Sequence, residues 1–322
     1  MRASPLCRRG RAPGGTETSA PGTPRQPTAG GDTAGTHHPR RRRTMGNITT
    51  SDGVTIHYEE QGTGPPLVLI HGWGFSGRFF TRNLDALAEH ARVITVDLRG
   101  HGDSGKPRHG YRVSRLAKDL FELLEELDLR EVTVLGWSLG CPVIWSYLEL
   151  FGSHRLARAV YVEQAPRQYY APDWPHAHAT CYDEPSLAAL QTQLTCDPPA
   201  FDEDQIGTIF AGEPTPQEKE LLLAEMAKSP AYARNALMAD HTRHDWRDLL
   251  PTIRLPSLVL VARQDQVFPW QGPAWVGEAL PGARTVFFEH SGHGLFFDEP
   301  EKFHRTVTGF LTDSRDDTEV LV

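Results

Sequence analysis

A serine that lies between two glycines is the first residue of this sequence whose setting suggests chemistry. Residues 132–140 begin as an apolar strand pattern and run into the pentapeptide Gly-Trp-Ser-Leu-Gly, and an apolar helical pattern follows. In such a strand-to-helix turn, glycines let neighbouring backbone come close, and the serine hydroxyl is presented at the carboxyl edge of the sheet. The pattern therefore predicts that Ser138 is a nucleophile.

A base and an acid follow the serine in the order that a catalytic triad requires. A serine hydroxyl is a weak nucleophile near neutral pH, so Ser138 needs a base that a third group orients. Asp265 follows the predicted strand 257–262, and His293 follows the predicted strand 285–289. These are the residue types of a serine, histidine and aspartate triad, in a known chain order. We expect His293 to be the base and Asp265 to be the acid that orients it.

Other histidines and acids compete for these two roles. His290 is the alternative base, but His293 has a glycine on each side, which permits a tight turn toward the neighbouring strand end. Asp245 and Asp298 are the alternative acids. Asp265 is preferred because it follows a buried-strand pattern.

Two backbone N–H groups are expected to stabilise the oxyanion of a tetrahedral intermediate. One belongs to Leu139, directly after the nucleophile. The other belongs to Trp73, in a glycine-rich turn that follows the apolar run 67–70. His71, which begins this turn, is interpreted as a residue that stabilises the loop and not as a base.

Short β-branched runs alternate with helical patterns from residue 54 onward, which is typical of a mostly parallel sheet covered by helices. The predicted strands are 54–59, 67–71, 92–97, 132–136, 159–163, 257–262 and 285–289. The predicted helices are 114–127, 143–150, 270–279 and 301–311. The first of these helices is the clearest, because its leucines recur on one face.

The alternation stops between residues 164 and 254, a stretch too long for an ordinary loop. Short helical patterns such as 216–228 occur in it, so we interpret 164–254 as a helical cap over one end of the sheet. Its aromatic side chains either pack within the cap or line a ligand pocket. They are Tyr169, Tyr170, Trp174, Tyr182, Phe201, Phe210 and Trp246.

Two further patterns are poor candidates for cofactor or metal sites. The glycines at 100, 102 and 105 match a dinucleotide fingerprint, but Lys106 and Pro107 follow where a helix should begin. Two histidine pairs have ligand-like spacing without an obvious third and fourth ligand nearby. These pairs are His176 with His178, and His241 with His244. We therefore expect no cofactor and no metal.

The composition is that of an ordinary globular protein with a basic N-terminal extension. Of 322 residues, 39% are hydrophobic and 23% are charged, and no apolar run approaches the roughly 18 residues that a membrane span requires. Residues 1–44 carry a net charge of +7, whereas residues 45–322 carry −15. Such an acidic body repels a nucleic-acid backbone. We expect a soluble, cytoplasmic protein that binds neither nucleic acid nor membranes.

The domain organisation follows from these patterns. Residues 1–44 are rich in Arg, Pro and Gly and have few side chains to bury, so we expect a disordered extension. An Arg-rich transit peptide is the alternative, and Met45 is the expected functional start. The α/β core is expected at 45–163 and 255–322, with the cap at 164–254.

The cysteines are expected to be free thiols, because none shows the C-x-x-C spacing of a zinc or redox site. Cys181 and Cys196 are close enough in sequence to pair in an oxidising compartment, but no secretory signal indicates one. The other two cysteines are Cys7 and Cys141.

Taken together, these motifs resemble those of the α/β-hydrolase superfamily, and within it the lidded esterases of the cofactor-free haloperoxidase and arylesterase group. The resemblance covers approximately residues 49–311. It rests on His71-Gly-Trp-Gly74, the D-x-R-G-x-G-x-S stretch from Asp97, the G-x-S-x-G motif, Asp265 with Pro269, and Ser291-Gly-His293. It implies an eight-stranded, mostly parallel sheet with flanking helices and a helical cap inserted after the sixth strand.

The resemblance also implies roles for single residues. Ser138, Asp265 and His293 would be the triad, and Trp73 and Leu139 the oxyanion donors. The serine excludes the branches of the superfamily that use an aspartate nucleophile.

The expected function is hydrolysis of small, apolar carboxylic esters or lactones through an acyl-enzyme. One alternative keeps the triad but cleaves carbon–carbon bonds, or removes acyl groups from small metabolites. Another is a low-turnover ligand sensor. The sequence leaves the natural substrate and the oligomeric state open.

Overall fold

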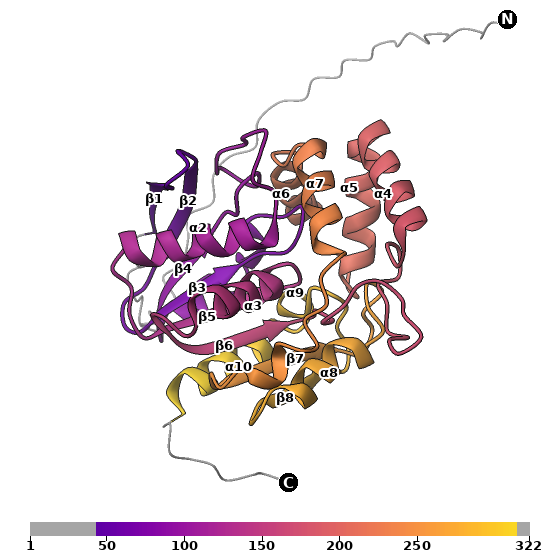
Figure 1. Ribbon diagram of the computed structural model, residues 1–322. Coiled ribbons are helices and arrows are strands. Elements are labelled where there is room, and N and C mark those ends of the chain that lie inside the picture. Colours follow the sequence, from indigo (N-terminus) through magenta and orange to yellow (C-terminus); the bar gives the residue numbers. More distant parts are fainter. Residues whose placement is uncertain (1–42, 314–322) are drawn as a thin grey trace, which may run out of the picture. The chain divides into compact units, whose positions relative to one another are not determined.

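The computed structural model describes residues 43–313, which form an eight-stranded sheet flanked by helices (Figure 1). The strands lie in the sheet in the order β1-β2-β4-β3-β5-β6-β7-β8. β1 and β2 are antiparallel to their neighbours, and all pairs from β4 to β8 are parallel. The bounds are β1 (Thr44–Thr49), β2 (Thr55–Gln61), β3 (Pro66–Ile70), β4 (Arg92–Val96), β5 (Val132–Trp137), β6 (Leu156–Val162), β7 (Ser257–Ala262) and β8 (Arg284–Phe288).

The seven predicted strands are all present, with small shifts at their ends. The structure adds β1, which the hydrophobic pattern does not predict because Ile48 is its one buried residue. Thr44, assigned above to the extension, is the first residue of this edge strand. The predicted disorder of residues 1–42 falls outside the described residues and stays a prediction.

Helices cover both faces of the sheet, and the strands alternate their side chains between the two layers. In β3, for example, Val68 and Ile70 belong to the apolar core on one face of the sheet, whereas Leu67 and Leu69 belong to the core on the other face. The helical elements of these layers are η1 (Gly77–Phe80), α1 (Leu84–Ala88), α2 (Val113–Glu126), α3 (Gly140–Phe151), η2 (Leu250–Thr252), α8 (Gln271–Ala279), α9 (Leu295–Asp298) and α10 (Pro300–Thr312). The four helices predicted for the core are confirmed.

Four more helices lie between β6 and β7 along the chain, and Figure 1 shows them gathered beside one end of the sheet. Local sequence explains where two of them begin. Asp183 and Ser186 form a capping box on the first of these helices, as do Thr215 and Glu218 on the third, and a proline occupies the first turn of each. The helices are α4 (Glu184–Cys196), α5 (Pro198–Ile209), α6 (Pro216–Met226) and α7 (Ala231–His241).

The cysteines of the described range are free thiols, as expected. Cys141 and Cys181 are buried and Cys196 is exposed, so the Cys181–Cys196 pairing considered above is not formed. Cys7 lies outside the described residues.

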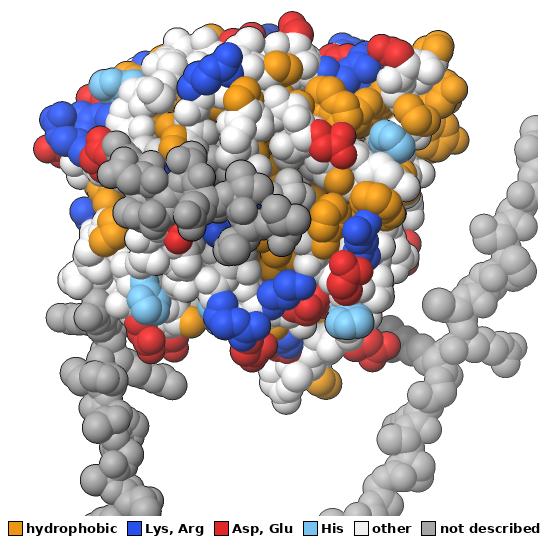
Figure 2. Space-filling view, turned by 90° about the horizontal axis from the view of Figure 1, so that it is seen from below, with side chains coloured by type: hydrophobic (Ala, Val, Ile, Leu, Met, Phe, Trp, Pro, Cys, Tyr) orange, Lys and Arg blue, Asp and Glu red, His pale blue; other side chains and the backbone are white. Residues whose placement is uncertain are grey.

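The described surface mixes charges of both signs. On the face shown in Figure 2, acidic and basic side chains are interspersed, and apolar side chains gather toward one side. No helix in residues 43–313 is both long enough and apolar enough to cross a bilayer.

Candidate active site

The parallel strands all end at one edge of the sheet, and the loops that follow them bring the predicted site residues together. Trp73 follows β3, Ser138 follows β5, Asp265 follows β7 and His293 follows β8. β3 and β5 are neighbours although β4 lies between them in sequence. Ligands of open parallel sheets bind at such a point, where the strand order reverses.

Ser138 sits at a sharp turn that the two flanking glycines make possible. Its φ of 51° lies in the left-handed region, which is strained for a residue with a side chain. A Cβ on Gly136 would lie 2.4 Å from the carbonyl carbon of Gly140, and one on Gly140 would lie 2.5 Å from the carbonyl oxygen of Ile70. The Ser138 N–H donates to the carbonyl of Val162 at 2.8 Å. The strained backbone is therefore held by its neighbours, and the side chain faces a cavity.

His293 and Asp265 form a buried pair. The Nδ1 of His293 lies 3.0 Å from Oδ2 of Asp265, and Oδ1 of Asp265 accepts the N–H of Val267 at 2.7 Å. The indole of Trp137 donates to the His293 carbonyl at 2.9 Å, which fixes the loop. Burial opposes ionisation of Asp265, but the charge and hydrogen bond of His293 outweigh it and hold the pKa of this carboxyl below its usual value. With Nδ1 donating to Asp265, Nε2 of His293 is free to act as a base.

The competing residues lie in other settings. His290 is exposed. Asp298 accepts the N–H of Gly292 at 2.9 Å, so it supports the histidine loop from outside. Asp245 is paired with Arg247 at 2.7 Å in the segment after α7. The structure thus brings Asp265, and not these acids, to His293.

One predicted oxyanion donor, Leu139, directly follows Ser138, and the other, Trp73, lies in the loop after β3. Within the described residues, neither the N–H of Trp73 nor that of Leu139 donates a hydrogen bond. The Trp73 indole donates to the Arg234 carbonyl on α7 at 2.8 Å, which fixes the side chain against the inserted helices. A Cβ on Gly72 would lie 3.2 Å from the Cβ of Ser138, so this loop passes close to the nucleophile.

Two neutral histidines connect the Trp73 loop to the loop after β4. His71 accepts the N–H of Leu98 on Nε2 at 2.9 Å, and its Nδ1 bonds to the Gly72 carbonyl at 2.7 Å. His101 accepts the N–H of Gly74 on Nε2 at 3.1 Å. Burial lowers the pKa of both rings, so both stay neutral and keep these acceptor roles. His71 thus stabilises the loop, as interpreted above.

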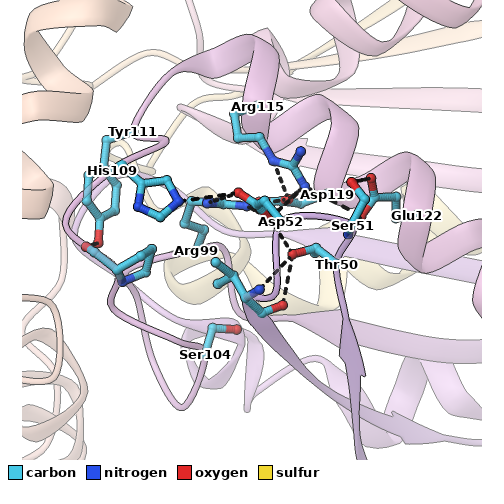
Figure 3. Close-up of polar contacts among 12 residues, drawn as sticks. Thr50, Ser51, Asp52, Arg99, Ser104, His109, Tyr111, Arg115, Asp119 and Glu122 are labelled. Atoms are coloured by element: carbon cyan, nitrogen blue, oxygen red, sulfur yellow. Dashed lines mark hydrogen bonds and ion pairs between the residues drawn. The ribbon is translucent and has the colours of Figure 1, made fainter.

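A buried arginine anchors the loop after β4 in turn (Figure 3). Arg99 is fully buried and pairs with Asp52 at 2.9 Å and with Asp119 on α2 at 2.8 Å. Arg115 contacts the same Asp119 at 2.7 Å. Ion pairs with several partners hold a buried guanidinium firmly, because an unpaired charge there is costly.

The glycines that resemble a dinucleotide fingerprint belong to this loop. Gly100 and Gly102 have φ of 84° and 46°, which suits a tight turn. The carboxylate of Asp97 accepts the N–H of Asp103 at 2.7 Å and fills the space beside Gly102. The next helix, α2, begins only at Val113. The motif shapes a support for the site and presents no helix N-terminus to a phosphate.

A small cavity of about 70 Å³ joins the predicted nucleophile and base. Its apolar wall includes Trp73, Phe75 and Phe268. None of the seven aromatic residues considered above in the inserted segment lines it. That segment contributes the apolar side chains Leu190, Ile209 and Met238 and the polar side chains Gln168, His178, Thr180, Gln205, Thr208 and His241.

His178 has a fixed tautomer in this wall. Its Nδ1 accepts the backbone N–H groups of Thr180 at 3.1 Å and of Cys181 at 3.2 Å, so the proton lies on Nε2. Burial lowers the pKa of the ring to about 4, and the charge of His293 adds to this. A neutral N–H donor therefore lies in the cavity wall. Sequence reasoning missed it, because histidine pairs were weighed as metal ligands and not as donors.

Comparison with known proteins agrees with the fold. The family model described as alpha/beta hydrolase fold matches residues 65–300. A non-heme chloroperoxidase of Streptomyces lividans is 30% identical over 280 residues, which cover 83% of this chain and 99% of that protein. A pimeloyl-[acyl-carrier protein] methyl ester esterase of Vibrio vulnificus is 28% identical over 259 residues, 79% of this chain and 97% of that protein.

A solved structure of an esterase has a similar fold. An esterase from Exiguobacterium antarcticum has a TM-score of 0.79 and 29% identity, covering 83% of this chain and 99% of that chain. The chain therefore belongs to the α/β-hydrolase fold family and, within it, to the group of haloperoxidases and esterases.

Proposed function

We propose that the protein hydrolyses small carboxylic esters or lactones through an acyl-enzyme formed on Ser138. One observation supports this most: the loop after β8 places His293 against Asp265 at 3.0 Å and in the wall of the cavity that Ser138 also lines. Esterases among the relatives agree with this reaction class.

The first half of the reaction forms the acyl-enzyme. His293 Nε2 takes the hydroxyl proton as Ser138 Oγ attacks the carbonyl carbon of the ester. The oxyanion of the tetrahedral intermediate accepts hydrogen bonds from the N–H groups of Trp73 and Leu139. The intermediate then expels the alcohol, which leaves with the proton that His293 holds.

The second half releases the acid. A water molecule gives its proton to His293 Nε2 and attacks the acyl carbon, and the same two N–H groups bind the second oxyanion. Collapse returns the proton to Ser138 Oγ and frees the carboxylic acid. Throughout, Asp265 keeps the proton-bearing Nδ1 of His293 oriented and stabilises the imidazolium.

The cavity indicates substrates with a short acyl group. Its volume of about 70 Å³ is small, and its walls combine aromatic rings with the polar side chains of the inserted segment. Apolar contacts would bind the acyl chain, while a few polar groups would fix its orientation. We propose that residues 164–254 act as a cap that closes this cavity.

Hydrolysis of p-nitrophenyl acetate tests the proposal. Ser138→Ala is expected to lower kcat by several orders of magnitude while the protein stays folded, because the nucleophile is lost. Ser146→Ala, on the buried face of α3, is the matched control and should keep activity close to that of the wild type. Undiminished hydrolysis by Ser138→Ala would contradict the proposal.

A further inference from the structure

A glutamate that the proposed reaction does not use lies beside the Asp265 and His293 pair. Glu163 directly follows β6, and its side chain is fully buried. An oxygen of Glu163, an oxygen of Asp265 and a ring nitrogen of His293 all lie within 4.8 Å of one another. Because β6 and β7 are neighbours in the sheet, their carboxyl ends place these two acids side by side.

The backbone and one oxygen of Glu163 are held in place. Its φ of 49° is in the left-handed region, which is strained for glutamate. Its Oε1 accepts the backbone N–H of Ala262, the last residue of β7. Its Oε2 is buried and has no hydrogen-bond partner among the described residues. The nearby Asp265 carboxylate, within 4.8 Å of this carboxyl, is a candidate partner for it.

Two carboxylates cannot both be ionised in such a buried space, so the pair holds one proton. Burial raises the pKa of Glu163 well above its usual value, and the negative charge of Asp265 raises it further. The pKa of Asp265 is held low by His293. The proton therefore resides on Glu163.

The other titratable groups near this pair do not change that assignment. Cys141 on α3 interacts electrostatically with Glu163, and burial raises the pKa of its thiol. His178 interacts with Asp265 and His293, and its pKa is lowered to about 4. Both are neutral at pH 7, so His293 is the group of this set that changes charge during the reaction.

We propose that Glu163 is a positioning residue whose protonated carboxyl donates a hydrogen bond to Asp265 and so holds the Asp265 carboxylate against His293 Nδ1. Oε1 already accepts from Ala262, and a proton on Oε2 that is donated to Asp265 would give the second oxygen a partner as well. This role rests on the proposed triad.

The direction of the effect follows from electrostatics. A donor on Asp265 takes up part of the carboxylate's negative charge, so Asp265 stabilises the imidazolium less strongly. Without the donor, Asp265 stabilises the imidazolium of His293 more strongly, so the acidic limb of the pH profile moves to higher pH. Glutamine preserves the arrangement, because its amide oxygen can accept from Ala262 and its amide N–H can donate to Asp265.

The experiment measures kcat/KM for p-nitrophenyl acetate from pH 5 to 9. Glu163→Leu is expected to shift the acidic limb of the kcat/KM profile to higher pH by about half to one pH unit and to lower kcat about tenfold. Glu163→Gln should leave the limb where it is in the wild type. Glu225→Gln, which changes a buried carboxyl of α6, is the control for loss of any buried acid and should also leave it unchanged.

Two results would overturn the positioning role. One is a Glu163→Leu variant whose acidic limb matches the wild type, and the other is a Glu163→Gln variant as impaired as Glu163→Leu. If Glu163→Leu fails to fold, the proposal is tested instead by infrared difference spectra of the wild type and Glu163→Gln, which detect a protonated carboxyl group. A protonated carboxyl band that is present at pH 7 and missing in Glu163→Gln is expected; its absence from the wild type contradicts the proposal.

Ser138→Ala separates this inference from the proposed function. If Ser138→Ala still hydrolyses the ester, the proposed function is wrong. If Ser138→Ala is inactive and Glu163→Leu leaves the acidic limb unchanged, only the role of Glu163 is wrong.

Discussion

His293 Nδ1 lies 3.0 Å from Asp265 Oδ2, although 28 residues separate them in the sequence. β7 and β8 are parallel neighbours, so the loops that follow them meet at one edge of the sheet. In the proposed reaction this contact decides which nitrogen of His293 carries the proton, and therefore whether Nε2 can accept one.

Asp265→Asn is expected to lower kcat by about 10³ to 10⁴-fold, because an amide can donate to Nδ1 and select the wrong tautomer of His293. Steady-state hydrolysis of p-nitrophenyl acetate measures the loss. Asp298→Asn, which changes a carboxylate that bonds to the backbone of the same histidine loop, should reduce kcat far less. Equal losses in the two variants would mean that Asp265 has no special role.

Stability is expected to fall as the pH drops below about 6.5, because several histidines are buried in the neutral form. For His178 the folded pKa is about 4 and the unfolded value is about 6.5, so below pH 6.5 the unfolded chain binds more protons. The free energy of unfolding should decrease by about 2 kcal/mol between pH 7 and pH 5 from this residue alone.

Denaturant unfolding of the wild type and His178→Gln at pH 7 and pH 5 measures this contribution. The variant should lose less stability on acidification than the wild type, because its amide does not titrate. Equal losses would show that His178 is not the source.

Arg99→Met is expected to destabilise the protein by about 3 to 5 kcal/mol, because it removes the buried guanidinium that bridges Asp52 and Asp119 and leaves Asp119 with Arg115 as its remaining partner. The loop that carries His101 would lose its anchor, so kcat should fall as well. Arg130→Met removes an exposed ion pair with Asp128 and should change stability far less, because such pairs contribute little. Thermal unfolding and hydrolysis rates of both variants test the anchoring role of Arg99. An Arg99→Met protein as stable and as active as Arg130→Met would contradict it.

His178→Phe is expected to change substrate preference more than the reaction itself. In the wild type, Nε2–H of His178 can donate to an acceptor oxygen in the acyl chain, so a methoxyacetate ester should lose about 5 to 50-fold in kcat/KM on substitution. A butyrate ester of similar length offers no such oxygen and should change less. If both esters lose activity equally, His178 does not bind the acyl chain.

The sequence predicts the core strands and the nucleophile turn because these depend on local patterns. Apolar runs mark β3, β5 and β7, and the glycines beside Ser138 indicate a turn that larger residues could not form. β1 was missed because it buries one side chain, Ile48, and therefore shows no alternation.

The missed residues near the site depend on contacts between distant segments. Glu163 was predicted as the last residue of a strand, and its interest arises only because β6 pairs with β7 and so brings it to Asp265. The one indication in the sequence is that Glu163, an acid, ends an otherwise apolar predicted strand. The role of His178 as an N–H donor is harder to predict, because its tautomer is fixed by backbone N–H groups that only the folded loop brings to it.

The most direct test of the proposed function is labelling with a fluorophosphonate, which reacts with activated serines, followed by mass spectrometry of the modified peptide. The expected result is one label, on Ser138, in the wild type, no label in Ser138→Ala, and much slower labelling in Asp265→Asn. A wild-type protein that stays unlabelled, or that is labelled at another serine, would contradict an acyl-enzyme at Ser138.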